Sequence, residues 1–328
     1  MRGEAEDTRP GRACPASYRY PPSVFRREPE IVADAIYVVG GLYGNVDALD
    51  AVRAMVVKEA NAALAFNGDF HWFDVDRDEF LAVNDVVMAH PALRGNVETE
   101  IAGDDSGAGC GCAYPLDVTD AEVSRSNRIL ERLRETAREF PEAREALGRL
   151  PMNLVARVGD ARIGIVHGDA SSLAGWGFAH DRLDDPSHRR WIENMFRDSG
   201  VDIFASSHTC LPALRAFEFE SGTRIVANNG ATGMPNFAGR LSGMLTRIAT
   251  QPFRGAEMLY SVQVRGVHVE AIEVGYDPGR WSGRFLASWP ERSPAHESYW
   301  RRISEGPRFR LEQAILDPGS LPRLRRPG

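Results

Sequence analysis

Four short strand-like runs in this chain each end, within three residues, at a side chain able to bind a metal ion. The runs cover residues 62–66, 92–94, 163–166 and 203–205, and they are followed by Asp69, Asn96, His167 and His208. Side chains that follow strands meet at one edge of a sheet, although they are far apart in the sequence. Carboxylate, amide and imidazole groups are ligands of divalent metals. The pattern therefore predicts a metal site at a sheet edge, with metal-assisted hydrolysis as the leading chemistry.

Strands and helices alternate in the first part of the chain. Residues 35–39 form an apolar run that stops at Gly40 and Gly41, and residues 46–60 then carry apolar side chains at helical spacing. A second helix is expected over residues 77–88. Alternation of this kind indicates an α/β core with its loops gathered at the carboxyl ends of the strands.

The later part of the chain is richer in strands. Strands are expected at residues 153–158, 162–166, 213–219, 224–227, 258–264 and 267–274. Turns rather than helices separate most of them, which indicates antiparallel or mixed pairing. Two stacked sheets would accommodate both parts of the chain.

The pattern divides the chain into four segments. Residues 1–34 are rich in Arg, Glu and Pro and are expected to form an irregular leader, whose Tyr18 and Tyr20 pack on the body. The main domain is expected over residues 35–275. Within it, residues 103–150 form an insertion with one or two solvent-facing helices, because charges of opposite sign recur at helical spacing. Residues 276–328 are expected to form a wrapping tail.

Composition narrows the class of partner. A formal net charge of −7 provides no general basic face, so nucleic acid is an unlikely partner. No apolar run approaches the roughly 20 residues that span a bilayer, and no secretory signal is recognisable, so a cytoplasmic protein without a membrane partner is expected. Four scattered cysteines favour reduced thiols or metal ligands over a disulfide framework. The oligomeric state stays open.

One ordered series of motifs carries a family resemblance. It comprises Gly41-Leu42-Tyr43-Gly44-Asn45, Gly68-Asp69, Gly95-Asn96, His167-Gly168 and Ser207-His208-Thr209-Cys210. In order and strand context this series resembles the calcineurin-like metallophosphoesterases over residues 35–275. The resemblance implies a four-layer α/β/β/α sandwich with two stacked mixed sheets. It also implies a centre of one or two divalent transition metal ions (Mn, Zn or Fe) that activates water against a small phosphorylated substrate.

Carried over residue by residue, the resemblance makes Asp69 the bridging carboxylate. Asn96, His167 and His208 would complete the second metal position. The first position departs from the family pattern, because Gly41 and Tyr43 stand where Asp and His are expected, and Cys210 replaces the last His. Val97 likewise replaces the His that assists the leaving group, while the acid after it, Glu98, is present.

Three readings of these departures remain open. The first is a rewired or mononuclear hydrolase in which Tyr43 and Cys210 are metal ligands and Glu98 or His71 acts in catalysis. Asp74, Cys110 and Cys112 are further candidates for replacing the missing ligands. The second is a phosphoesterase fold that has lost catalysis and serves as a binding or regulatory module. The third is a different metal-dependent reaction at the same place.

Ordinary structural roles compete with several of these assignments. Asp69 after a glycine is also a common turn residue, and Tyr43 is as well explained by packing of its ring. Cys210 may be read as a small buried apolar residue. Trp176 and Phe178 fit either the mouth of a cleft or the core. Residues 228–235 resemble the loop that follows the last His motif in small bacterial phosphoesterases, and also read as a tight turn.

Overall fold

The computed structural model describes residues 8–104 and 107–315. Their strands form two six-stranded mixed sheets. The first has the order β11-β12-β10-β2-β3-β4 and the second the order β1-β5-β6-β7-β9-β8. The first sheet consists of β2 (Ala35–Val39), β3 (Ala62–Asn67), β4 (Ala92–Leu93), β10 (Gly243–Ala249), β11 (Met258–Val264) and β12 (Val267–Val274). The second consists of β1 (Ile31–Ala33), β5 (Asn153–Val158), β6 (Ala161–Val166), β7 (Ile203–Ser206), β8 (Pro212–Phe219) and β9 (Gly222–Asn229).

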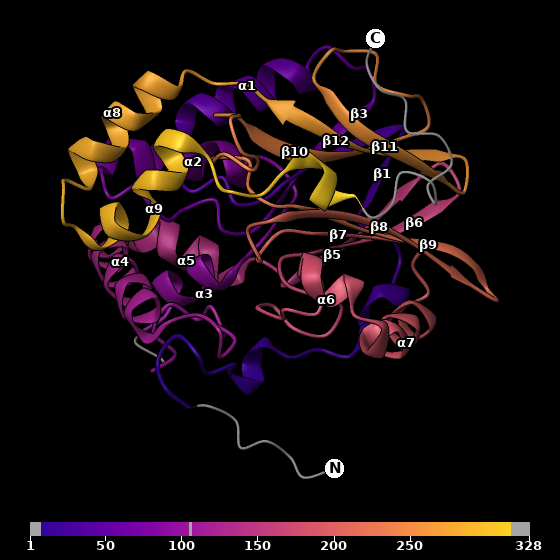
Figure 1. Cartoon of the computed structure of the whole chain (residues 1–328), viewed down its shortest axis with the longest axis horizontal. Helices are drawn as coiled ribbons and strands as arrows, with labels where there is room; N and C mark the ends of the chain where they lie inside the picture. The colour runs from indigo at the N-terminus through magenta and orange to yellow at the C-terminus, as the bar shows by residue number, and fades with distance from the viewer. Residues whose placement is uncertain (1–7, 105–106, 316–328) are drawn as a thin grey trace.

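Helices cover the outer face of each sheet (Figure 1). Over the first sheet and at its side lie α1 (Val46–Val56), α2 (Arg77–Met88), α3 (Asn96–Ala102), α4 (Asp120–Arg138), α5 (Pro141–Arg149), α8 (Pro278–Ser288) and α9 (Pro294–Glu305). Over the second lie α6 (His180–Asp184) and α7 (Arg189–Ser199). Short 3-10 helices occupy Ala16–Tyr18, Pro22–Arg26, Pro186–His188 and Leu311–Ala314. The predicted four-layer sandwich with two stacked mixed sheets is confirmed.

The strand β2 shows how the layers form. Its side chains alternate between the two faces of the sheet, so Ile36 and Val38 are buried between the sheets while Tyr37 and Val39 are buried under the helices. All five residues of this strand are buried. A strand covered on both faces is therefore continuously apolar, as residues 35–39 are.

Several elements were not expected from the sequence. The residues around Arg247 form β10 at the centre of the first sheet, where the guanidinium is 2% exposed and paired with Glu59 and Glu270. Residues 278–305 contain the helices α8 and α9, and Ile31–Ala33 pairs with β5. Tyr18 and Tyr20 are buried, as predicted for the leader.

The helices α4 and α5 lie where the sequence predicts an inserted pair. The longer one is not simply solvent-facing, because Ile129, Leu130 and Leu133 are fully or almost fully buried in the core beneath it. Charged side chains cover its other face, where Glu131 pairs with Arg134 and Arg138. No helix among the described residues combines the length and apolarity needed to cross a bilayer.

Candidate metal centre

Parallel pairing brings the predicted ligands to one edge of the sandwich. In the first sheet β2, β3 and β4 are parallel, so Asp69, after β3, lies near Asn96, which follows β4 and begins α3. In the second sheet β6 and β7 are parallel, so His167 and His208 emerge side by side. The stacking of the sheets joins the two pairs. All four predicted residues lie together and are buried.

The ligand atoms of these side chains converge on one point. Asp69, His167 and His208 each offer an atom within 4.8 Å of the atoms offered by the other two. Nε2 of His167 is 3.3 Å from Oδ2 of Asp69, 3.1 Å from Oδ1 of Asn96 and 3.1 Å from Nδ1 of His208. Movements of a few tenths of an ångström would bring four ligands within bonding distance of a single divalent ion.

Backbone carbonyls fix which atoms face this point. Nδ1 of His167 donates to the carbonyl of Asn67 at 2.9 Å, and Nε2 of His208 donates to the carbonyl of Cys112 at 3.1 Å. The amide nitrogen of Asn96 donates to the carbonyl of Cys110 at 2.9 Å. In the neutral imidazoles the inward ring nitrogens therefore carry lone pairs, and the amide turns its oxygen inward.

Four lone-pair donors thus face one another in a buried space. Such an arrangement repels itself unless a cation or a proton lies between the donors. Burial opposes charge on His167, yet the Asp69 carboxylate and the Asn67 carbonyl raise its pKa above the ordinary value. Burial and the neighbouring His167 lower the pKa of His208 to about 3, so that ring stays neutral. The donor set fits a divalent cation with mixed nitrogen and oxygen ligands.

Four of the eight non-glycine residues with positive φ in the described part of the chain lie at the site. Tyr43, Asp69, His208 and Cys210 have φ values of 55°, 50°, 20° and 60°. These lie at or near the left-handed region, which is unfavourable for side chains other than Gly, Asn and Asp. Unfavourable backbone conformations of this kind persist only where the surrounding structure enforces them, and they are more frequent at functional sites.

Glu98 holds the loop that carries Asp69. Its carboxylate is fully buried and accepts hydrogen bonds from the backbone amides of Asp69, His71 and Gly95 at 2.8, 3.2 and 2.8 Å. Burial and the Asp69 charge raise its pKa to about 7. Glu98 does not line the cavity beside the ligands. Its geometry is that of a residue that positions Asp69.

His71 also lies behind the site rather than in it. Its Nδ1 is 2.6 Å from Oδ2 of Asp74, and both side chains are fully buried. The ring stacks on Phe80 at a centroid distance of 4.1 Å. Neither His71 nor Asp74 lines the cavity, so the structure does not bring them to the predicted ligands.

Tyr43 and Cys210 face the cavity and contact each other. The phenol oxygen is 3.0 Å from the sulfur, so one of the two donates a hydrogen bond to the other. Burial raises the pKa of both groups, which keeps them protonated. Cys210 is outside the convergent group, and its sulfur donates a hydrogen bond to the carbonyl of His208 at 3.3 Å.

The expectation that all cysteines are reduced thiols or metal ligands is wrong for two of them. Cys110 and Cys112 are joined in a disulfide, with Cα atoms 5.4 Å apart. Gly111, at φ +65°, turns the chain so that the two side chains meet. The loop reaches the site through its carbonyls, which hold Asn96 and His208. Cys14 and Cys210 are free.

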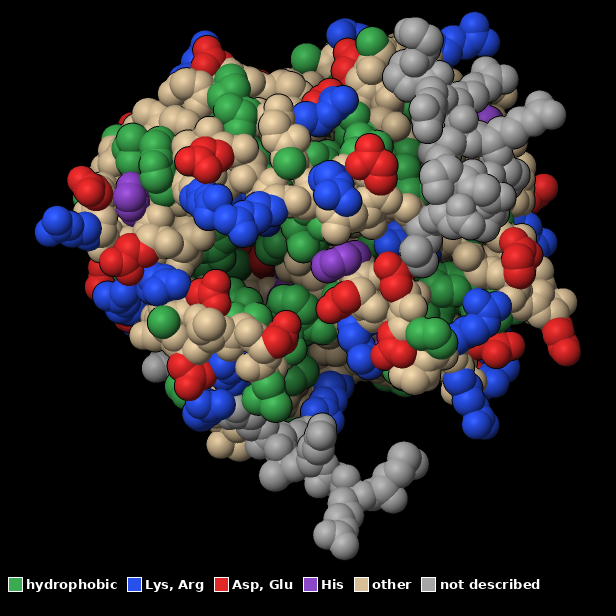
Figure 2. All heavy atoms as spheres, viewed as in Figure 1, with side chains coloured by type: hydrophobic (Ala, Val, Ile, Leu, Met, Phe, Trp, Pro, Cys, Tyr) green, Lys and Arg blue, Asp and Glu red, His purple; other side chains and the backbone are tan. Residues whose placement is uncertain are grey.

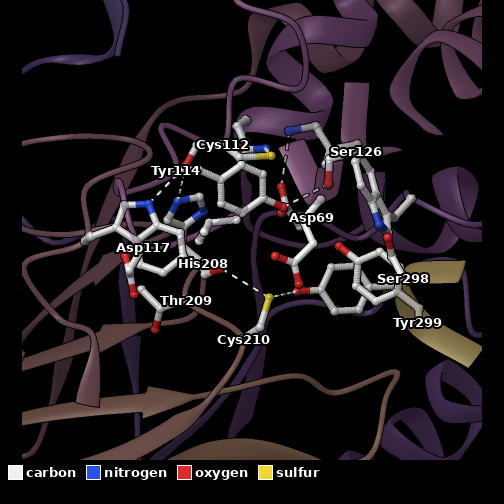
Figure 3. Close-up of a pocket in the computed structure, with 17 residues that line it drawn as sticks. Asp69, Cys112, Tyr114, Asp117, Ser126, His208, Thr209, Cys210, Ser298 and Tyr299 are labelled. Carbon is white, nitrogen blue, oxygen red and sulfur yellow. Dashed lines mark hydrogen bonds between the residues drawn. The ribbon is translucent and has the colours of Figure 1, made fainter. Parts of the chain in front are cut away.

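A cavity of about 380 Å³ opens in front of the ligands. Five aromatic side chains contribute to its walls, namely Tyr43, Trp72, Tyr114, Trp176 and Tyr299 (Figure 3). Tyr43 and Trp176 were candidates from the sequence, whereas the other three, which come from separate parts of the chain, were not expected at the site. Phe178 lies in the core under the second sheet. No periodic signal marks such scattered residues.

The N-terminal segment supports one wall of this cavity. Arg12 is 7% exposed and donates to the carbonyls of Pro115 and Val118 at 2.7 and 2.6 Å and to Asp120 at 2.6 Å. Gly11 donates to the carbonyl of Ala108. These bonds fix the loop between Tyr114 and Val118, which forms part of the mouth.

Comparisons with known proteins support the fold. No protein-family model matches the sequence, and no curated protein matches it. The structure resembles a hypothetical protein from Pyrococcus horikoshii OT3, with 20% identity and a TM-score of 0.57 over 85% of this chain and 100% of that one. It also resembles a metallophosphoesterase from Sphaerobacter thermophilus, with 16% identity and a TM-score of 0.52 over 83% of this chain and 100% of that one. The chain has the metallophosphoesterase fold.

Proposed function

We propose that this chain, built on the metallophosphoesterase fold, hydrolyses a phosphate mono- or diester with water activated by a divalent metal ion. The observation that carries the proposal is the convergence of Asp69, His167 and His208 on one buried point at the floor of a cavity. Four side chains turn lone pairs toward this point, and each side chain is oriented by a further hydrogen bond or by a fixed loop. Such an arrangement is typical of a metal site and not of a structural core.

The ligands of one ion would be Asp69, Asn96, His167 and His208. When bound, a divalent cation of the Mn, Zn or Fe type supplies Lewis acidity and lowers the pKa of its water. Glu98 holds the Asp69 loop in place, and His71 braces the same loop from behind through Asp74. Tyr43 and Cys210 are a candidate second position, which would take an ion only after both have lost their protons.

Val97 has a consequence for the substrate. It lines the cavity next to Asn96, at the point where an imidazole would assist the leaving group. A valine donates no proton there. Esters whose leaving group departs as a stable anion, such as p-nitrophenolate, should therefore react faster than alkyl esters.

The experiment combines metal analysis with turnover. Purified protein should carry about one transition metal ion per chain and hydrolyse p-nitrophenyl phosphate or bis-p-nitrophenyl phosphate with Mn²⁺ or Zn²⁺. Asp69→Ala and His167→Ala should lose both metal and turnover. His268→Ala, on β12, where the ring contacts Gln263, is the matched control and should keep both. A metal-free protein that Mn²⁺ and Zn²⁺ do not stabilise against heat would contradict the proposal.

A second candidate function rests on the Tyr43–Cys210 pair. Two protonated side chains that bond to each other stand where a second ion would be held, which favours a binding or regulatory module without catalysis. This alternative predicts no turnover of either ester with any metal, while a phosphorylated ligand still raises the melting temperature. Metal-dependent turnover that disappears in Asp69→Ala removes it.

A further inference from the structure

The cavity in front of the candidate metal centre has walls of aromatic rings at steep angles to one another. Tyr114 and Trp176 have centroids 6.0 Å apart and ring planes tilted by 46°, and Trp176 meets His208 edge-on at 5.3 Å and 72°. Tyr299 adds another ring from α9, and it hydrogen-bonds to Tyr114 and Trp72. A flat base stacks best between parallel faces, whereas tilted faces enclose a compact, rounded group.

These rings are held firmly. The indole nitrogen of Trp176 donates to the carbonyl of Cys112 at 3.0 Å, and the Tyr114 hydroxyl lies 3.0 Å from that of Ser126. Asp169 accepts hydrogen bonds from Ser171, Ser172 and Gly177, which fixes the loop that carries Trp176. Rings that do not need to be ordered on binding make a preorganised site.

The charged side chains that line the cavity are all acidic. Asp69, Asp117 and Glu122 line the cavity, and none of its lining residues within the described part of the chain is Lys or Arg. Two arginines lie behind the lining. Arg302 donates to the carbonyls of Pro235 and Cys210, and Arg125 donates to Ser298 and lies near Glu122. Glu122 is thus partly offset by Arg125, and Asp117 is the carboxylate to test.

Figure 3 shows Asp117 on the side of the cavity where His208 and Thr209 lie, and Tyr299 on the side where Ser298 lies. Aromatic faces and a carboxylate attract a cation, and aromatic walls are a known binding environment for quaternary ammonium groups. A doubly charged phosphomonoester finds no protein cation here. A phosphodiester has one negative charge, and an ammonium group makes such a molecule neutral overall.

We propose that the substrate is a zwitterionic phosphodiester whose ammonium group lies among Tyr114, Trp176 and Tyr299, facing Asp117. This inference rests on the proposed function, because the phosphate of the same molecule would lie at the metal centre. In hydrolysis the oxygen of water bonds to phosphorus while the bond to the leaving oxygen breaks, and the leaving group departs with the electron pair.

Two isosteric substrates test the charge alone. The first is p-nitrophenyl phosphorylcholine, which releases p-nitrophenolate and phosphocholine. The second is the p-nitrophenyl ester of 3,3-dimethylbutyl phosphate, in which carbon replaces the charged nitrogen. With Mn²⁺ or Zn²⁺ present, kcat/KM should be roughly tenfold higher for the choline ester. Trp176→Leu and Asp117→Asn should each move this ratio toward one, and Asp50→Asn, an exposed carboxylate on α1, should leave it unchanged.

A binding measurement separates the two proposals. Choline and 3,3-dimethylbutanol are titrated against the purified protein, with tryptophan fluorescence as the readout, and choline should bind at least several-fold more tightly. Preferential choline binding without turnover of any ester supports the cation site and contradicts the phosphoesterase. Turnover with equal kcat/KM for the two isosteres, or with a preference for the p-nitrophenyl ester of thymidine 5′-phosphate, overturns the cation site and leaves the phosphoesterase in place. Equal binding without turnover overturns both.

Discussion

The phenol oxygen of Tyr43 lies 3.0 Å from the sulfur of Cys210, and both residues have positive φ. Each occupies a place where the family pattern expects an imidazole. Because burial raises the pKa of both groups, neither offers the phenolate or thiolate that a second ion would need. The centre is therefore asymmetric, with a convergent group formed by Asp69, His167 and His208 and a protonated pair formed by Tyr43 and Cys210.

This asymmetry predicts the metal content of a cysteine variant. Cys210→Ser replaces the sulfur with a weaker ligand for soft metals but keeps a hydrogen bond to Tyr43. We expect about one ion per chain in both proteins, with the same metal identity by mass spectrometry. Cys14→Ser, at a free cysteine outside the cavity, is the control. A lower metal content in Cys210→Ser alone would show that the thiolate is a ligand.

Removal of a histidine ligand should abolish stabilisation by metal. Zn²⁺ at 100 times its dissociation constant stabilises a folded protein by about 2.7 kcal/mol if only that state binds it. We expect the native chain to show a stabilisation of that order in thermal denaturation, and His167→Ala to show none. The stability gain should persist in His268→Ala. Equal gains in both variants would place the ion elsewhere.

Glu98 should act on stability and metal affinity together. Glu98→Ala leaves three buried backbone amides without their acceptor, at a cost on the order of 3 kcal/mol in the free energy of unfolding. The loop that presents Asp69 then loosens, so Zn²⁺ affinity should fall as well. Urea unfolding of the metal-free protein and a zinc titration measure the two effects. Glu145→Gln, an exposed partner of Arg149, should change neither.

Gly95 has no room for a side chain. A Cβ there would lie 2.2 Å from Oδ1 of Asp69 and 2.7 Å from its backbone nitrogen, so Gly95→Ala must displace the carboxylate. We expect Gly95→Ala to lose metal binding and to destabilise the chain by about 1–3 kcal/mol. Gly283→Ala in α8 meets nothing within 4 Å and should stabilise by up to about 1 kcal/mol. Metal analysis and thermal denaturation of the two variants test this contrast.

The convergence of the candidate ligands was predictable because each follows its own strand. Asp69, His167 and His208 come directly after apolar runs, and the parallel pairing of those runs places them at one edge. The strand β10 was not predictable in the same way. The charge of Arg247 interrupts its apolar pattern, and only the fold shows that Glu59 and Glu270 neutralise it there.

The cavity walls could not be read from the sequence. Trp72, Tyr114 and Tyr299 come from three distant segments, and no spacing links them. The roles of Glu98 and His71 were equally hidden, since a sequence shows that an acid follows Asn96 but not that its oxygens face backbone amides. Figure 2 shows acidic and basic side chains interspersed on this face of the surface. The net charge of the chain therefore did not predict that all the charged side chains lining the cavity are acidic.

Arg12 connects the start of the described chain to the cavity mouth through Pro115, Val118 and Asp120. None of these residues is a candidate ligand, and the segment before β1 contributes no strand to either sheet. The residues that hold the cavity mouth are therefore separate from the residues that converge at the candidate metal centre.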